Sequence, residues 1–153
     1  MKKGKMIEIV LDHFEMHEFK RSFIRKMGDE YVCDGGFIVN APDECISVNF
    51  NNMKHTYDIF SLMGSLWGNW NDCPSWRIMK EKAKEWNNCY AAEVRQIAHD
   101  AVVFQCTRQL SDSEIEELLS DISKFAPNSL DIADYEAIKK NIAEEGKFTL
   151  WWD

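Results

Sequence analysis

The final six residues, Phe148–Asp153, constrain the fold of this chain most, because they include two adjacent tryptophans. Chain ends usually fray and carry small polar residues, and a tryptophan is costly to leave in water. Apolar residues alternate along this stretch, which predicts a β-strand inserted into a sheet. Because alternate side chains point to opposite faces, we predict that Trp152 is in the core. Trp151 and Asp153 then share the other face, where they are available as site residues.

Hydrophobic periodicity predicts a mixed set of elements along the rest of the chain. The expected strands are 7–11, 37–39, 46–50, 92–98, 101–107 and 147–152, and the expected helices are 15–27, 56–62, 74–86, 111–126 and 134–146. We find no linker, internal repeat or shift in composition. The sequence therefore predicts one domain, 1–153, of the α+β class, with helices packed on one face of a mostly antiparallel sheet.

Composition excludes several classes of partner. The chain has 153 residues and a net charge of −8, which argues against nucleic acid or an anionic membrane as a partner and suits a basic protein. The basic start of the chain leads into a short apolar run that contains charges, so we expect neither a signal peptide nor a membrane span. The five cysteines include no C-x-x-C pair, which indicates free thiols. Free thiols are typical of a reducing compartment, and we expect the protein to be cytoplasmic.

Common catalytic signatures are absent from the sequence. His13 and His17 have the spacing of metal ligands on a helix, but the glutamate of the zinc protease motif is misplaced, so we predict no metal site. His99 and Asp100 are adjacent on a strand or turn, where they do not pair as base and orienting acid. Cys73 precedes a predicted helix, but a buried thiol is the simpler interpretation. We expect no catalytic residue and no cofactor.

One segment, 67–76, concentrates three tryptophans, two asparagines and one aspartate in ten residues. A loop of this composition is either folded onto the core as a lid or exposed as a recognition surface. In the first case Trp70 and Trp76 fill the core, and Asn71 or Asp72 caps the helix that begins near Pro74. The sequence leaves both interpretations open.

An ordered set of motifs then resembles a bacterial family called domain of unknown function 4253. The motifs are Trp70-Asn71-Asp72-Cys73-Pro74, a helix ending at Trp86, Tyr90-Ala91-Ala92-Glu93-Val94, Asp100, and Leu150-Trp151-Trp152-Asp153. The resemblance covers about 67–153, and we assign 1–66 to a β-rich N-terminal part of the same domain. It implies fold and boundaries, and it implies no particular activity.

The sequence departs from the family pattern before the last predicted helix. Family members usually carry a Tyr/Phe-Cys-Pro-Asp motif followed by a Gln-Gly turn. The corresponding stretch here is Phe125-Ala126-Pro127-Asn128, and the Gln-Gly turn is replaced. A site built on those family groups is therefore not expected in this chain.

Two hypotheses for function follow. The first is a protein-interaction module, of the immunity or antitoxin kind, with a basic partner. The second is a small-molecule or enzymatic site between the tryptophan loop and the tail. The residues that we predict to form a binding site are Trp67, Trp70, Asn71, Asp72, Cys73, Trp151 and Asp153.

Overall fold

A computed structural model of the chain describes residues 5–11, 13–27, 30–33, 36–40, 45–50, 53–68, 72–98, 100–130 and 134–152. The strands are β1 (Lys5–Val10), β2 (Ile24–Met27), β3 (Glu30–Cys33), β4 (Gly36–Asn40), β5 (Cys45–Phe50), β6 (Ala92–Ala98), β7 (Ala101–Cys106) and β8 (Lys147–Trp151). The helices are α1 (His13–Phe23), α2 (Ile59–Met63), α3 (Trp76–Tyr90), α4 (Asp112–Phe125) and α5 (Tyr135–Glu145), with short 3₁₀ turns η1 (Thr56–Asp58), η2 (Gly64–Leu66) and η3 (Pro127–Ser129).

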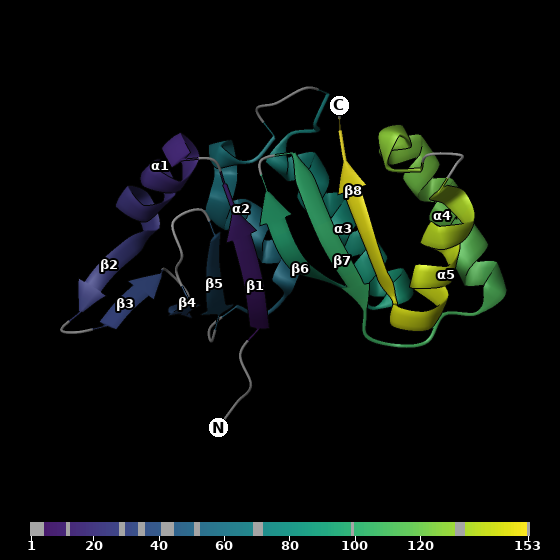
Figure 1. Ribbon diagram of the computed structural model, residues 1–153, viewed down its shortest axis with the longest axis horizontal. Helices are drawn as coiled ribbons and strands as arrows, with labels where there is room; N and C mark the ends of the chain where they lie inside the picture. The colour runs from purple at the N-terminus through teal and green to yellow at the C-terminus, as the bar shows by residue number, and fades with distance from the viewer. Residues whose placement is uncertain are drawn as a thin grey trace.

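The described strands form one eight-stranded sheet in the order β2-β3-β4-β5-β1-β6-β7-β8. Neighbouring strands in this order are antiparallel, with the exception of the parallel pair β1 and β6. β1 therefore joins the N-terminal strands to β6, β7 and β8, which lie to its right in Figure 1. This arrangement confirms a single-domain α+β fold with a mostly antiparallel sheet.

One face of the sheet is buried because apolar residues alternate along the strands. Ile7 and Ile9 of β1, Phe104 of β7, and Phe148 and Leu150 of β8 are all buried on this side. In Figure 1, α2 lies near β1 and α3 lies behind β6 and β7, whereas α4 and α5 lie beyond β8. The central strands thus carry a period-two pattern, with one face packed against helices.

An aromatic cluster fills the space between α3, α4 and the last strands. The ring of Trp86 on α3 makes edge contacts with Phe104, Phe148 and Phe125, at centroid distances of 5.5, 5.6 and 5.9 Å. Phe104 and Phe148 stack on each other at 5.1 Å. Edge-to-face and offset contacts at these distances favour aromatic packing beyond the burial of area.

The expected helix at 15–27 is too long. α1 ends at Phe23, and the following residues form β2, with Ile24 opposite Cys33 of β3. Apolar spacing of three and four residues continues to Met27, so periodicity alone extends the helix. The ladder with β3 decides the conformation, and tertiary pairing outweighs the local pattern.

Two predicted helix starts are also displaced. α3 begins at Trp76 rather than at Pro74, and its N-cap is Ser75, whose hydroxyl accepts a hydrogen bond from the Ile78 amide at 3.4 Å. Asp72 therefore does not cap this helix. Thr56 does not cap η1, because His55 is the N-cap and the buried Thr56 hydroxyl accepts a hydrogen bond from the Val94 amide of β6.

Other predicted boundaries are confirmed. Ser111 and Glu114 form a capping box at the start of α4, with reciprocal hydrogen bonds of 3.2 and 3.0 Å. Gly146 ends α5 in the left-handed conformation at φ 71°. A side chain at Gly146 would place its Cβ 2.8 Å from the Cys106 carbonyl oxygen, so glycine is required there. Among the described helices, none combines the length and the apolar character of a membrane span.

Candidate functional site

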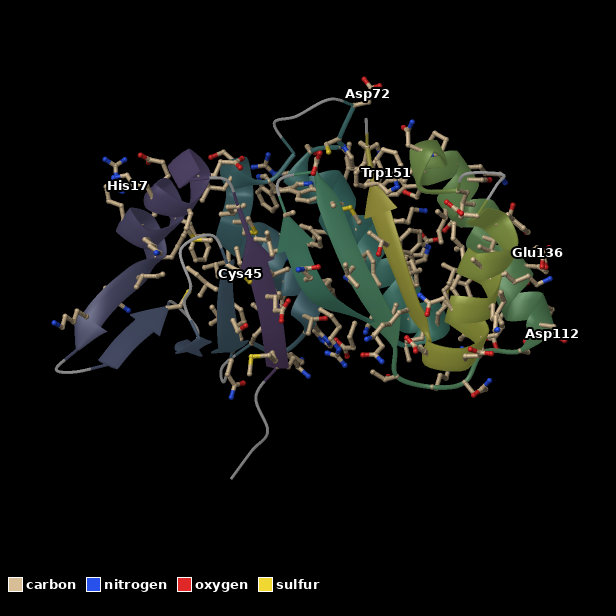
Figure 2. All side chains as sticks on the ribbon, in the orientation of Figure 1. His17, Cys45, Asp72, Asp112, Glu136 and Trp151 are labelled. Atoms are coloured by element: carbon tan, nitrogen blue, oxygen red, sulfur yellow. The ribbon has the colours of Figure 1, made fainter. Side chains whose placement is uncertain are left out.

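The tail places its two tryptophans on opposite faces of the sheet. The side chain of Trp152 is 3% exposed, whereas that of Trp151 is 42% exposed. The Trp152 ring packs against Phe125 of α4 at 5.8 Å and against Trp67 at 6.0 Å. The predicted division, with Trp152 in the core and Trp151 at the surface, is confirmed. Figure 2 shows Trp151 at the end of β8.

The backbone of Trp151 is held on its outer side by one hydroxyl group. Ser129 of η3 accepts a hydrogen bond from the Trp151 amide at 2.9 Å and contacts the Trp151 carbonyl oxygen at 3.3 Å as a donor. On the other side, Trp151 lies opposite Ala101 of β7. The exposed indole is therefore carried on a backbone that is fixed from both sides.

A groove of about 340 Å³ lies between β8, η3 and α5, with Trp151 in its wall. We call it the Trp151 groove, and its lining residues are Asn128, Ser129, Asp134, Ile138, Asn141, Lys147, Phe148, Thr149 and Trp151. Its volume lies near the lower end of the range for ligand sites. The lining combines two aromatic residues with two amides, two hydroxyls and charges of both signs, so it suits a ligand that is partly apolar and partly polar.

Charges are distributed unevenly along the Trp151 groove. α5 leads through Gly146 directly into β8, and the two elements run in opposite directions. Asp134 at the start of α5 therefore lies at the same end of the groove as Trp151, and Lys147 lies at the other end. Asp134 occupies the N-cap position of α5, but its side chain makes no capping hydrogen bond in the described structure. Its carboxylate is therefore available to a ligand at the Trp151 end.

The tryptophan loop meets the tail through its first residue. Trp67 is 2% exposed and makes edge contacts with Phe60 of α2 and with Trp152, at 5.4 and 6.0 Å. Its indole N–H is buried and has no hydrogen-bond partner among the described residues. Trp67 is thus part of the core, on the face of the sheet opposite to Trp151. The side chains of Trp67 and Trp151 therefore do not form one binding surface.

The other predicted residues of the loop have different positions. Asp72 is exposed and projects away from the sheet at the end where Trp151 lies (Figure 2). Trp76 is half-buried, and the Arg77 guanidinium lies 4.6 Å from its ring centre. The predicted residues Trp70, Asn71 and Asp153 lie outside the described residues.

Cys73 is the predicted site residue whose chemistry the structure defines best. Burial, together with the negative charges of Asp100 and Asp72, raises the pKa of the Cys73 thiol to about 12. A thiol with this pKa is protonated at neutral pH and is a poor nucleophile. His17 is exposed, and the described residues contain no cluster of His, Cys, Asp and Glu that could hold a metal ion. The electrostatics at Cys73 are thus opposite to those of a catalytic cysteine.

Sequence reasoning missed most of the Trp151 groove. Ser129, Asp134 and Asn141 are ordinary polar residues of a turn and a helix, and nothing in their spacing connects them with β8. One available signal was the stretch after Phe125, where the sequence departs from the family pattern. The structure places Asn128 and Ser129 of that stretch in the groove wall.

A second groove, of about 500 Å³, lies along α3 and was not predicted either. It is lined by Arg77, Ile78, Glu81, Lys82, Glu85 and Phe125. Ile78 is the most exposed large apolar residue of the described structure, at 56%. Helical spacing places Ile78 on the polar side of α3, so the amphipathic pattern alone classifies it as a surface position.

The comparisons with known proteins bear on the region that forms both grooves. The model of one family, described as Domain of unknown function (DUF4253), matches residues 50–153. This segment begins at the last residue of β5 and includes every described residue of the Trp151 groove. No curated protein and no solved structure is significantly similar to the chain. The chain belongs to the family described as Domain of unknown function (DUF4253).

Proposed function

We propose that this protein is a cytoplasmic protein-interaction module that docks a partner at the Trp151 groove. The observation that carries the proposal is the Trp151 indole, which is 42% exposed although β8 pairs with β7 and Ser129 bonds to the Trp151 backbone. A rigid tryptophan loses little conformational entropy when a partner covers it. Tryptophan is also enriched among residues that dominate binding energy at interfaces.

The charge of the protein supports a basic partner. A net charge of −8 accelerates association with a positively charged protein through long-range attraction. The Asp134 carboxylate supplies a local acidic group beside Trp151. An immunity or antitoxin role, in which the module covers a basic toxin, combines these features.

The test compares Trp151→Ala with a matched control. Met6→Ala is suitable, because Met6 is a large apolar side chain of similar exposure, 39%, on a different strand. Full-length wild type and both variants are used as bait in the native host, and the captured partner is then purified and titrated against each. We expect Trp151→Ala to weaken binding by about 2 kcal/mol or more, the range of interface hot spots, and Met6→Ala to bind like wild type.

The proposal predicts salt dependence as well. Raising ionic strength from low to physiological screens long-range attraction, so the association rate with a basic partner falls. A purified native partner that binds Trp151→Ala as tightly as wild type would contradict the docking site. Capture of no partner, together with a bound metabolite in native mass spectrometry, would contradict the interaction module.

A second candidate function is a small-molecule site between the loop and the tail. The observation that favours it is the buried Trp67 indole N–H beside Trp152, which has no hydrogen-bond partner among the residues that the structure describes. A buried donor without a partner is costly, and a ligand acceptor would satisfy it. Native mass spectrometry of the wild type and of Trp67→Phe tests this function, because phenylalanine removes the donor. A bound metabolite that is retained equally by Trp67→Phe would exclude this donor from the site.

A further inference from the structure

We infer that the Trp151 groove receives an extended segment of the partner, which adds to the edge of β8 as a further strand. The inference rests on the proposed function, and it names the chemical class of the partner's contact. It follows from the backbone of β8 rather than from its side chains alone. β8 is the last strand in the order of the sheet, so β7 covers one of its edges and the opposite edge faces η3 and α5.

The register of β8 identifies which backbone groups face outward. The Cys106 amide donates to the Gly146 carbonyl at 2.8 Å, and the Trp152 amide donates to the Asp100 carbonyl at 3.3 Å. In an antiparallel ladder, every second residue bonds to the neighbouring strand. Residues 146, 148, 150 and 152 therefore bond toward β7, whereas the backbone groups of Lys147, Thr149 and Trp151 point to the other side.

Only part of this outer edge is occupied in the described structure. The Ser129 hydroxyl bonds to the outward amide and carbonyl groups of Trp151. Thr149 lies two residues earlier, and its backbone amide and carbonyl face the Trp151 groove, which Thr149 lines. Proteins normally protect a sheet edge with proline, a bulge or covering structure. η3 and α5 lie over this edge, but they leave a cavity of about 340 Å³ beside Thr149.

The side chains of the groove favour a segment of alternating character. Trp151 and Ile138 supply apolar wall, so a side chain of the segment that points toward them should be apolar. Asp134 lies at the Trp151 end, where it favours a basic residue, and a guanidinium above the indole would gain a cation–π contact. Lys147 lies at the other end and favours an acidic residue. The inferred segment is therefore a short β-strand with a basic residue at one end.

The experiment uses a displayed library of random peptides of about nine residues, longer than the five-residue β8. The library is selected on the full-length protein, with Trp151→Ala used to remove peptides that bind elsewhere. The tightest peptide is then synthesised, and its affinity is measured for Thr149→Pro and for the matched control Thr149→Ala. Proline removes the outward N–H, and an edge position of this kind tolerates it. Both variants lose the threonine side chain.

We expect Thr149→Pro to bind the peptide about tenfold more weakly than Thr149→Ala, because one interface hydrogen bond is lost and its partner is left unpaired. We also expect the bound peptide to slow hydrogen exchange of the Thr149 amide in the wild type. If Thr149→Pro fails to fold, the selected peptide is instead N-methylated at alternate positions and titrated against the wild-type protein. We expect the N-methylated peptide to bind about tenfold more weakly than the unmodified peptide.

Two outcomes would overturn the inference. One is that selection on the wild type yields no peptide that depends on Trp151. The other is that a Trp151-dependent peptide binds without protecting the Thr149 amide and is insensitive to proline at 149. The second outcome leaves the docking function intact, because Trp151 would still carry binding. Failure of the docking function itself is recognised separately, by a native partner that ignores Trp151→Ala.

Discussion

A single carboxylate, Asp121, connects the centre of the core with the surface. The Trp86 indole is fully buried and donates to Asp121 at 2.6 Å. Lys82 lies 3.3 Å from the same carboxylate. Burial acts to lower the pKa of Lys82, but the hydrogen bond to Glu85 and the charge of Asp121 outweigh it, so the pKa is raised. Asp121 thus satisfies a buried donor and a partly buried charge together.

Replacing Asp121 by alanine should destabilise the fold by about 1–3 kcal/mol, because the buried Trp86 N–H loses its acceptor. Asp121→Asn keeps an acceptor oxygen and should lose less. Glu117→Ala is the control for the change in helix propensity, because Glu117 is an exposed residue of the same helix. Urea unfolding followed by tryptophan fluorescence measures all three. Equal midpoints for Asp121→Ala and Glu117→Ala would show that the indole bond contributes nothing.

The raised pKa of Cys73 predicts a slow thiol. With a pKa of about 12, this thiol carries almost no thiolate at pH 8, and alkylating agents react with the thiolate. Cys89 is exposed on α3 and should be modified well before Cys73. Timed treatment of the native protein with iodoacetamide, followed by peptide mass spectrometry, measures both rates. Fast alkylation of Cys73 would indicate an activated cysteine and would favour an enzymatic site.

At the scale of elements, the start of α4 is fixed by charge as well as by its cap. The Arg108 guanidinium donates to Glu114 at 2.5 Å, and Glu114 also accepts a hydrogen bond from the Ser111 amide. These two hydrogen bonds lower the pKa of Glu114 to about 2, Arg108 having the larger effect. The folded protein therefore prefers the ionised form of Glu114 more strongly than the unfolded chain does.

The pH dependence follows from the sign of this shift. Because the folded pKa lies below the ordinary value of 4.5, the contribution of Glu114 to stability is complete above that value. It is lost as pH falls from 4.5 toward 2. Glu114→Gln should therefore be less stable than wild type at pH 6, and the gap should narrow on acidification. Urea midpoints between pH 6 and pH 3 measure it. A gap that stays constant over this range would refute the assignment.

At the scale of the whole molecule, the family segment 50–153 lacks the strand that completes its sheet. β1 pairs with β6 through Glu8, Ile9 and Val10, and it buries Ile7 and Ile9 on the packed face. Without β1, β6 would present an open edge and an apolar surface. The residues before 50 therefore belong to the same cooperative sheet as the family segment.

Expression of 50–153 alone should accordingly give a protein that is less stable and prone to self-association. The two isoleucines account for about 1.5–3 kcal/mol each of lost burial, and the uncovered edge of β6 is a template for pairing between chains. Light scattering after size-exclusion chromatography measures the association, with the full-length chain as control. A monomeric 50–153 that unfolds as cooperatively as the full chain would contradict a shared sheet.

The sequence by itself determined the features that depend on neighbours along the chain. The alternation in the tail placed Trp152 in the core and Trp151 outside it, because side chains of a strand alternate between faces. The Ser111–Glu114 capping box and the glycine at the end of α5 were also predicted, because capping involves residues three or four apart. The α+β class was predicted from the order in which segments with the helical period of 3.6 residues and segments with the strand period of two follow one another along the chain.

Tertiary structure decided whatever depends on residues far apart in sequence. α1 stops at Phe23 because β3 pairs with the residues that follow, and Thr56 bonds to β6 instead of capping a helix. The Trp151 groove exists because Ser129 and Asp134 lie beside an edge strand that begins after them in the chain. Spacing carries no information about such contacts. The sequence could therefore identify Trp151 as a site residue, whereas the surface around it is set by packing.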